Sequence, residues 1–240
     1  MKKITILLSL FLVCQIANAQ MFSKEKIQHK VNVDKKLLSW GYYLGYNSLD
    51  FKFDYKTLAK DITTAKSGGF NVGLLGNLRI TEHIDLRTEP GLVITNRVLL
   101  FDESYFSSIP FDDRKPSDLD RELKATYVYL PLSLKFSTTR VNNLRPFVQI
   151  GVAAAINLSS NEKNPDDNSN GTFRTKSNMS FYELGLGIDF YFQWFKFSPT
   201  IKGVFALNDE VVRDKDVNSP WTGNIEQMQT RGIFINFVIQ

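Results

Sequence analysis

Eight segments of strand length follow one another along the chain. In most of them, alternate positions are apolar, and the positions between them are polar or glycine. This two-residue period is that of a β-strand with one apolar face. The segments are 40–53, 70–80, 84–100, 125–136, 145–158, 181–192, 197–207 and 232–240. The pattern therefore predicts an all-β fold of eight strands.

The first segment shows how strongly the two faces differ. Trp40, Tyr42 and Leu44 share one face, while Gly41 and Gly45 share the other. The sixth segment repeats the contrast, with apolar side chains at every even position from 182 to 190 and two glycines between them. The apolar face is continuous from 40 to 46 and from 182 to 190, as in a strand with one side against lipid.

The connections between these segments alternate in length. The short ones are 81–83, 138–144 and 193–196, and the long ones are 54–67, 102–124, 159–180 and 208–228. Short periplasmic turns and longer surface loops are typical of bacterial outer-membrane barrels. Because a strand in lipid must satisfy its backbone groups laterally, the sheet must close. We therefore expect residues 40–240 to form an eight-stranded antiparallel up-and-down transmembrane β-barrel.

Charged residues recur on the polar faces, which such a barrel turns inward. They number four cations and four anions, namely Arg79, Asp85, Arg87, Glu89, Lys135, Glu183, Asp189 and Lys202. Charges in a low-dielectric interior must be paired, and a ring of eight strands encloses a space that side chains fill. We expect a neutralising charge network that plugs the lumen.

A secreted β-sandwich or a lipocalin-like barrel is the soluble alternative, since its strands also alternate. In such a soluble protein, the apolar faces of all strands would point inward and share one core. The polar faces would then form the outer surface, and their many glycines would have no explanation. The aromatic residues favour the membrane barrel, because Tyr42, Tyr46, Tyr182 and Trp194 fit interfacial girdles.

The first nineteen residues have the pattern of a secretory signal. Lys2 and Lys3 precede an apolar run over 4–13, and small residues follow at 17–19. We expect cleavage after Ala19 and export to the outer membrane. Lipoprotein processing at Cys14 is the competing interpretation, but Phe11 and Val13 do not fit a lipobox.

Residues 20–39 form a lead-in before the first strand, expected in the periplasm. It is basic, with Lys24, Lys26, Lys30, Lys35 and Lys36. The segment either docks a partner or is a disordered lead-in.

Charge and cysteine content exclude several classes of protein. The formal charge is +4, and two lysines leave with the signal, so the mature chain carries only +2, too little to indicate a nucleic-acid partner. Cys14 is the only cysteine, so the mature chain has no disulfide and no thiolate site. After the signal, no apolar stretch approaches the length of a membrane helix.

Few residues are candidates for catalysis or ligand binding. His29 and His83 both fall on the expected periplasmic side without a nearby nucleophile, so we expect no catalytic residue, no cofactor and no enzymatic activity. Residues 166–171 match the start of a calcium loop, but Ser177 stands where the bidentate Glu is needed, which favours a flexible polar loop and no metal site. The acidic residues at 112, 113, 118 and 120 are interpreted as a solvated face.

The C-terminal strand resembles the signal by which barrel assembly machinery recognises its substrates. The matching residues are Thr230, Gly232, Ile235 and Phe237. The chain departs from that signal by ending on Gln240 instead of an aromatic residue.

Several stretches resemble the Bacteroidetes outer-membrane β-barrel family. They are residues 129–135 (YLPLSLK), 145–147 (RPF) leading to Gly151, and 197–202 (FSPTIK). Within this larger family, residues 40–47 (WGYYLGYN) and 50–55 (DFKFDY) resemble the PorT family, also called SprT, of the type IX secretion and gliding-motility system. The seventh segment departs from the family, because it has Gly-Val-Phe at 203–205 where an aromatic-Ser-x-Gly run is usual.

The resemblance implies an accessory barrel that works through contacts with other secretion-machinery proteins, with outer-membrane lipid around it. Two alternatives stay open. One is a surface barrel whose long loops bind ligands or neighbouring cells, and the other is a narrow porin.

Overall fold

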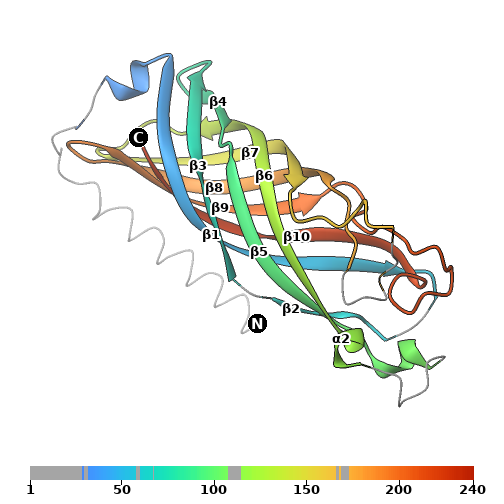
Figure 1. Ribbon diagram of the computed structural model, residues 1–240. Helices are drawn as coiled ribbons and strands as arrows, with labels where there is room; N and C mark the ends of the chain where they lie inside the picture. Colours follow the sequence, from blue (N-terminus) through green and yellow to red (C-terminus); the bar gives the residue numbers. More distant parts are fainter. Residues whose placement is uncertain are drawn as a thin grey trace, which may run out of the picture.

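The computed structural model describes residues 29, 32–57, 60–66, 68–107, 115–165, 168 and 173–240. Within them, ten strands form one antiparallel sheet that closes on itself (Figure 1). The strands are β1 (Leu38–Tyr55), β2 (Thr63–Lys66), β3 (Gly68–Arg79), β4 (Ile84–Thr88), β5 (Gly91–Leu100), β6 (Asp120–Ser137), β7 (Leu144–Asn157), β8 (Asn178–Tyr191), β9 (Lys196–Ala206) and β10 (Ile225–Ile239). The short helices are η1 (Val33–Lys35), η2 (Glu103–Phe106) and α2 (Pro116–Leu119). No helix in the described ranges has the length and apolar character needed to cross a membrane.

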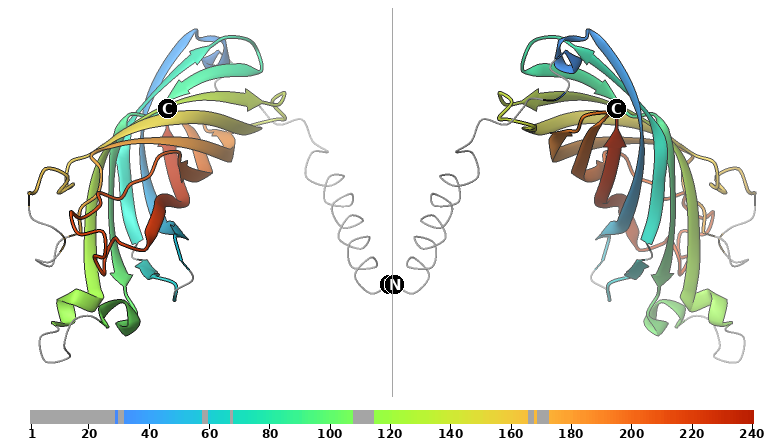
Figure 2. Two further views of the ribbon diagram at one scale, coloured as in Figure 1. Left: turned by 90° about the vertical axis from the view of Figure 1, so that its right-hand side faces the viewer. Right: turned by 90° about the vertical axis from the view of Figure 1, so that its left-hand side faces the viewer.

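Strand β1 closes the ring because it pairs on both sides. Tyr42 lies opposite Ile239 of β10 and opposite Leu74 of β3. Strand β2 continues the line of β3, and β4 and β5 together form one line between β3 and β6. The ring therefore has eight strand positions in up-and-down order, which confirms the predicted fold class (Figures 1 and 2).

The prediction of one continuous third strand over 84–100 is wrong. The strand breaks at Glu89 and Pro90, because proline has no backbone N–H to donate to the ladder. The register is the same on both sides of the break, with Thr88 opposite Leu132 and Gly91 opposite Tyr129 on β6. The same side-chain face therefore points inward before and after the break.

The strands also extend further toward the long loops than the alternation indicated. Strand β6 begins at Asp120 instead of 125, β10 begins at Ile225 instead of 232, and part of the expected loop 54–67 is β2. Outward positions there are polar or charged, as at Lys52 and Glu122, so the apolar face ends while the backbone ladder continues.

The outer surface of the ring is apolar, as predicted. Trp40, Leu74 and Leu186 are each more than 60% exposed, and Tyr42, Tyr46, Tyr182 and Trp194 are exposed as well. The inward positions of the same strands are buried. The predicted orientation of the two faces is confirmed.

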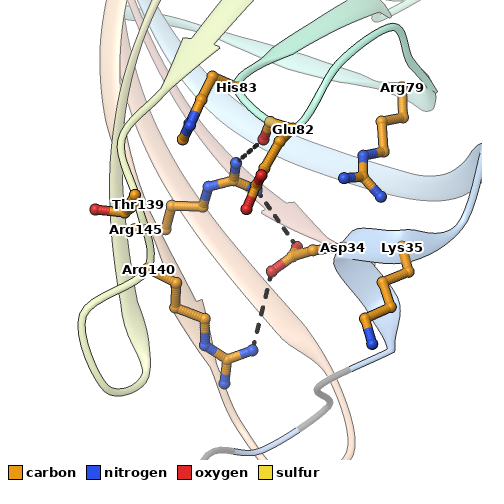
Figure 3. A pocket seen from close by; sticks show the side chains of 8 residues that line it. All are labelled: Asp34, Lys35, Arg79, Glu82, His83, Thr139, Arg140 and Arg145. Carbon is orange, nitrogen blue, oxygen red and sulfur yellow. Dashed lines mark hydrogen bonds and ion pairs between the residues drawn. The ribbon is translucent and has the colours of Figure 1, made fainter.

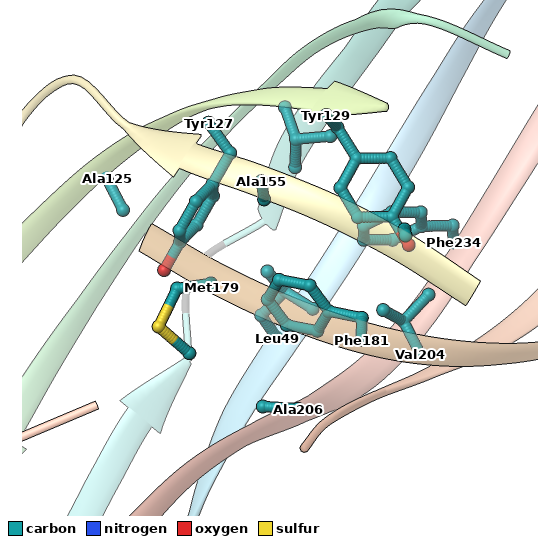
Figure 4. Close-up of a cluster of buried hydrophobic side chains, with 12 residues drawn as sticks. Leu49, Ala125, Tyr127, Tyr129, Ala155, Met179, Phe181, Val204, Ala206 and Phe234 are labelled. Atoms are coloured by element: carbon teal, nitrogen blue, oxygen red, sulfur yellow. The ribbon is translucent and has the colours of Figure 1, made fainter. Parts of the chain in front are cut away.

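The middle of the lumen holds an aromatic layer that the alternation did not reveal (Figure 4). The ring centroid of Tyr129 lies 5.8 Å from that of Phe181 and 5.7 Å from that of Phe234. Tyr127 packs edge-on to Phe181 at 6.3 Å. These residues come from β6, β8 and β10, so the layer joins opposite walls of the barrel.

A second apolar cluster fills the end of the lumen nearest the long loops. It includes Leu99, Met228 and Trp221, all buried, and Trp221 lies 5.8 Å from Phe106 between ring centroids. Strands and loops both contribute to it, so the loops close over this end of the barrel.

Inward glycines make room for the large side chains of the lumen. A Cβ at Gly151 would lie 2.4 Å from Oγ of Ser133, so we expect Gly151→Ala to destabilise the barrel by about 1–3 kcal/mol through overpacking. The matched control is outward-facing Gly203, where the nearest atom to a Cβ would be in the Phe205 ring at 3.1 Å and the Leu184 carbonyl oxygen would lie 3.9 Å away. Urea unfolding in detergent micelles measures both variants. Equal stability of the two alanine variants would contradict this account of the lumen packing.

Candidate functional site

Buried charges lie across the lumen beside the aromatic layer. We call Arg87, Glu89, Glu183 and Lys202 the central ion network. Lys202 Nζ lies 2.5 Å from Glu89 Oε2 and 3.5 Å from Glu183 Oε1. Arg87 Nε lies 2.6 Å from Glu89 Oε1. None of the four side chains is more than 3% exposed, so the network is shielded from water.

The central ion network ties together strands that are far apart in the ring. Glu89 lies at the break between β4 and β5, Glu183 on β8 and Lys202 on β9. Strand β6 joins through Ser133 and Tyr129, whose hydroxyls donate to Glu183 at 2.5 and 3.2 Å. Each carboxylate therefore accepts more than one hydrogen bond, as buried charges require.

A second buried pair lies nearer the short turns. Lys135 Nζ lies 2.6 Å from Asp189 Oδ2, and Ser198 Oγ donates to Asp189 Oδ1 at 2.5 Å. Lys135 Nζ also lies 4.0 Å from the ring centroid of Phe147. The pair and the central ion network together contain three cations and three anions, so their charges balance.

Six of the eight charges expected in the lumen belong to these two groups. The other two, Arg79 and Asp85, lie opposite each other at the short-turn end, on β3 and β4. Arg79 Nε donates to the carbonyl of Thr81 at 3.2 Å. Among the described residues, neither side chain has an ion pair with the other six.

The charges predicted from the sequence omit four further buried arginines, Arg97, Arg121, Arg145 and Arg174, of which the first two contact aromatic rings at the long-loop end of the lumen. Arg97 donates to Thr230 Oγ1 at 2.7 Å and to the Tyr127 hydroxyl at 3.0 Å, and it lies 3.8 Å from the Phe51 ring centroid. Arg121 lies 4.5 Å from the Trp221 ring. Arg97 lies two residues after Thr95 and therefore on the same inward face of β5, so the alternation could have identified it. Arg121 lies before residue 125, where the predicted segment begins, so the alternation did not cover it.

Two of the long loops, those that contain Arg174 and Asp214, are joined by one carboxylate. Asp214 Oδ1 lies 2.8 Å from Nη2 of Arg174, and its Oδ2 accepts hydrogen bonds from Ser219 at 2.5 Å and Thr222 at 3.2 Å. Both charged side chains are buried. This arrangement, called here the loop cap, fixes residues 208–224 over the mouth of the barrel.

Two carboxyl groups at the long-loop end of the barrel have shifted pKa values. Hydrogen bonds from Lys60 and Ser104 lower the pKa of Asp102 to about 2. Burial raises the pKa of Glu210, although Arg97 and hydrogen bonds from Thr230 oppose the shift. Asp102 therefore stays ionised in mild acid, whereas Glu210 is ionised less readily than an exposed Glu.

The opposite mouth, at the short turns, contains a charged bowl of about 390 Å³ (Figure 3). Its walls come from η1, the β3–β4 turn and the β6–β7 turn. The lining residues are Asp34, Lys35, Arg79, Glu82, His83, Thr139, Arg140 and Arg145. Asp34 lies 3.9 Å from Arg140 and 3.7 Å from Arg145, and it accepts a hydrogen bond from the Tyr191 hydroxyl at 2.7 Å.

The two histidines lie at this mouth. His83 Nδ1 lies 3.1 Å from the carbonyl oxygen of Ser137, and the backbone N–H of His29 donates to Asn143 Oδ1 at 2.9 Å. Residues 33–35 of the predicted lead-in form η1, whose Asp34 contacts the barrel. The signal segment and Lys24, Lys26 and Lys30 lie outside the described residues.

The residues of the predicted assembly signal alternate across β10. Thr230 and Gly232 face the lumen, and Ile235 and Phe237 face outward. Phe237 stacks on Phe197 of β9 with ring centroids 6.1 Å apart.

Of the calcium-like stretch 166–171, only Asn168 is described; the rest lies outside the described residues. Asn168 is buried, and its Oδ1 accepts a hydrogen bond from the backbone N–H of Arg174 at 2.9 Å. The acidic positions 112 and 113 also lie outside the described residues, and Asp118 pairs with Arg121 at 3.3 Å.

Comparison with protein families supplies the identification. A model described as outer membrane protein beta-barrel domain matches residues 18–212, most of the chain. The chain belongs to this family. It is therefore an outer-membrane β-barrel, and its apolar outer surface faces lipid. The comparison with curated proteins gives no match.

Solved outer-membrane proteins are similar to this barrel at low sequence identity. Neisserial surface protein A is 7% identical with a TM-score of 0.43, covering 85% of this chain and 99% of its own. OprG from Pseudomonas aeruginosa is 15% identical with a TM-score of 0.44, covering 84% of this chain and 93% of its own. AlkL, solved in lipid bilayers, is 12% identical with a TM-score of 0.42, covering 91% and 92%.

The central ion network of the outer-membrane barrel can be tested by removing its shared cation. Lys202→Met leaves Glu183 without a cation in contact, and we expect it to destabilise the barrel by about 3–5 kcal/mol. The double variant Lys202→Met/Glu183→Gln restores neutrality and should recover part of this loss. Urea unfolding in micelles, followed by tryptophan fluorescence, measures all three proteins. A double variant no more stable than Lys202→Met would refute the charge-balance account.

Proposed function

We propose that this barrel is a non-enzymatic accessory component of type IX protein secretion and gliding motility. In this proposal, the signal at 1–19 directs export and is removed, and the mature barrel acts by binding other machinery proteins at its two mouths. The barrel assembly machinery inserts it into the outer membrane, using the C-terminal strand with Thr230, Gly232, Ile235 and Phe237.

The filled lumen is the observation that carries the proposal. Aromatic side chains, paired charges and the loop cap occupy successive levels between the two mouths. A protein filled in this way is better suited to contacts at its ends than to passing solutes. The same filling disfavours the porin alternative, which requires a conducting path.

The resemblance to the PorT family adds support from the first strand. The stretches 40–47 and 50–55, which carry that resemblance, both lie within β1. This strand closes the ring with β10 and runs the whole height of the barrel.

Gene deletion in the native bacterium tests the proposed role. We expect loss of secretion of C-terminally tagged cargo and loss of surface spreading, with recovery when the intact gene is supplied in trans. Immunoblotting of culture medium and colony-spreading assays measure the two effects. Unchanged secretion and spreading in the deletion strain would exclude the proposal, and stable conductance of the purified barrel in planar bilayers would favour the porin.

The second candidate is a surface barrel that binds ligands through its loops. It is favoured by the exposed tip of the loop cap, where Val217 is 77% exposed. Replacing residues 215–218 by Gly-Ser-Gly-Ser should then reduce cell adhesion and leave cargo secretion unchanged. The opposite result would support the secretion role.

A further inference from the structure

The charged bowl at the short-turn mouth has more positive than negative groups. Its lining includes four cations, Lys35, Arg79, Arg140 and Arg145, against the carboxylates of Asp34 and Glu82. The six charges of the central ion network and the Lys135–Asp189 pair balance, so these two groups do not compensate the excess. The bowl therefore attracts anions from the periplasm.

The two arginines beside Asp34, Arg140 and Arg145, each have Nη1 donors that could bind a further acceptor. Arg145 donates through Nε to Thr138 O at 2.9 Å and through Nη2 to the carbonyl of Glu82. Arg140 donates through Nε to Asn142 O at 2.8 Å, and through Nη2 to Asn143 Oδ1 at 2.7 Å and to the carbonyl oxygen of His29. Their Nη1 atoms lie 3.7 and 3.9 Å from Asp34, beyond hydrogen-bond distance.

The cations on the other side of the bowl are less engaged (Figure 3). Within the described part of the chain, the Arg79 side chain makes one hydrogen bond, through Nε to the carbonyl of Thr81, and both of its terminal nitrogens are available. Lys35 is exposed and, among the described residues, has no ion pair. These two cations face a cavity with space for a small anionic group.

We infer that this bowl binds carboxylate groups of an acidic periplasmic polypeptide. Asp34 shows the chemistry of recognition, because a carboxylate on a chain segment already lies between the two arginines. The bowl lies inside the ring of strand ends, with Arg145 buried on the lumen side of β7. A phospholipid headgroup stays on the outer side of that ring, whereas an extended peptide can enter along the barrel axis.

This inference deepens the proposed function, since it names the chemistry of a partner at one mouth. It rests on the proposed secretion role only for the identity of that partner. Peptide binding is measured with the purified barrel and does not require secretion. The bowl can therefore fail to bind peptide while the secretion role holds, and the secretion role can fail while the bowl binds peptide.

Fluorescence anisotropy of labelled hexaglutamate tests the inference with the full mature barrel in zwitterionic micelles at low salt. We expect saturable binding that Lys35→Gln/Arg79→Gln weakens about tenfold, since exposed Lys35 and half-buried Arg79 lose their contacts with the peptide. The matched control is Lys52→Gln/Arg231→Gln, which removes the same charges at the long-loop end, and it should change affinity less than twofold.

Competition separates the possible sources of the anion. Glutamate-rich peptide should displace the probe at lower concentration than inorganic phosphate or dihexanoyl phosphatidylglycerol. Stronger displacement by phosphate or by the lipid would overturn the assignment to carboxylates. Equal weakening by the two double variants, both shown to be folded by heat-modifiable gel mobility, would show general charge attraction and also refute the bowl as a site.

Discussion

Lateral satisfaction of the backbone is the constraint on which the structure depends. A strand in lipid has no water to accept its N–H groups or donate to its carbonyls, so every strand needs two neighbours. Strand β1 meets this need by pairing with both β10 and β3. Closure in turn creates an inside, and a ring of eight positions is narrow enough for side chains to fill it.

The filling differs along the axis because different side chains meet at each level. Near the short turns, Lys135 and Asp189 form a buried ion pair, and the central ion network follows. The aromatic layer and the second apolar cluster occupy the levels toward the loops. Small inward residues such as Gly151 lie beside the larger groups, so the wall stays continuous while the lumen stays packed.

The two mouths are built differently, and this difference matters for function. The loop cap closes one mouth around Asp214, a carboxylate with several buried donors. The other mouth has a bowl in which two arginines share Asp34 and further cations line the cavity. The proposed contacts with other proteins rest on this difference between a filled axis and two unlike mouths.

The sequence by itself determined the strand count, the up-and-down order and which face of each strand meets lipid. These follow from a local two-residue period and from loop lengths, which need no knowledge of distant contacts. The proline at position 90 could have predicted the strand break. Nothing in the sequence predicted that the register with β6 is the same before and after it. The strand ends beyond the apolar belt were missed because hydrogen bonding continues there without an apolar face.

The tertiary structure decided which inward groups meet. Lys202 and Glu89 are far apart in sequence, and only the stagger of strands around the ring brings them to 2.5 Å. The same stagger leaves Arg79 and Asp85 at the mouth, where, among the described residues, they form no ion pair with the other six charges even though Asp85 lies opposite Lys135 on β6. Whether a residue has an odd or even position in its strand decides whether its side chain points into the lumen or toward lipid. Its level along the barrel axis and the side chains that it meets depend on the stagger of the strands in the closed sheet.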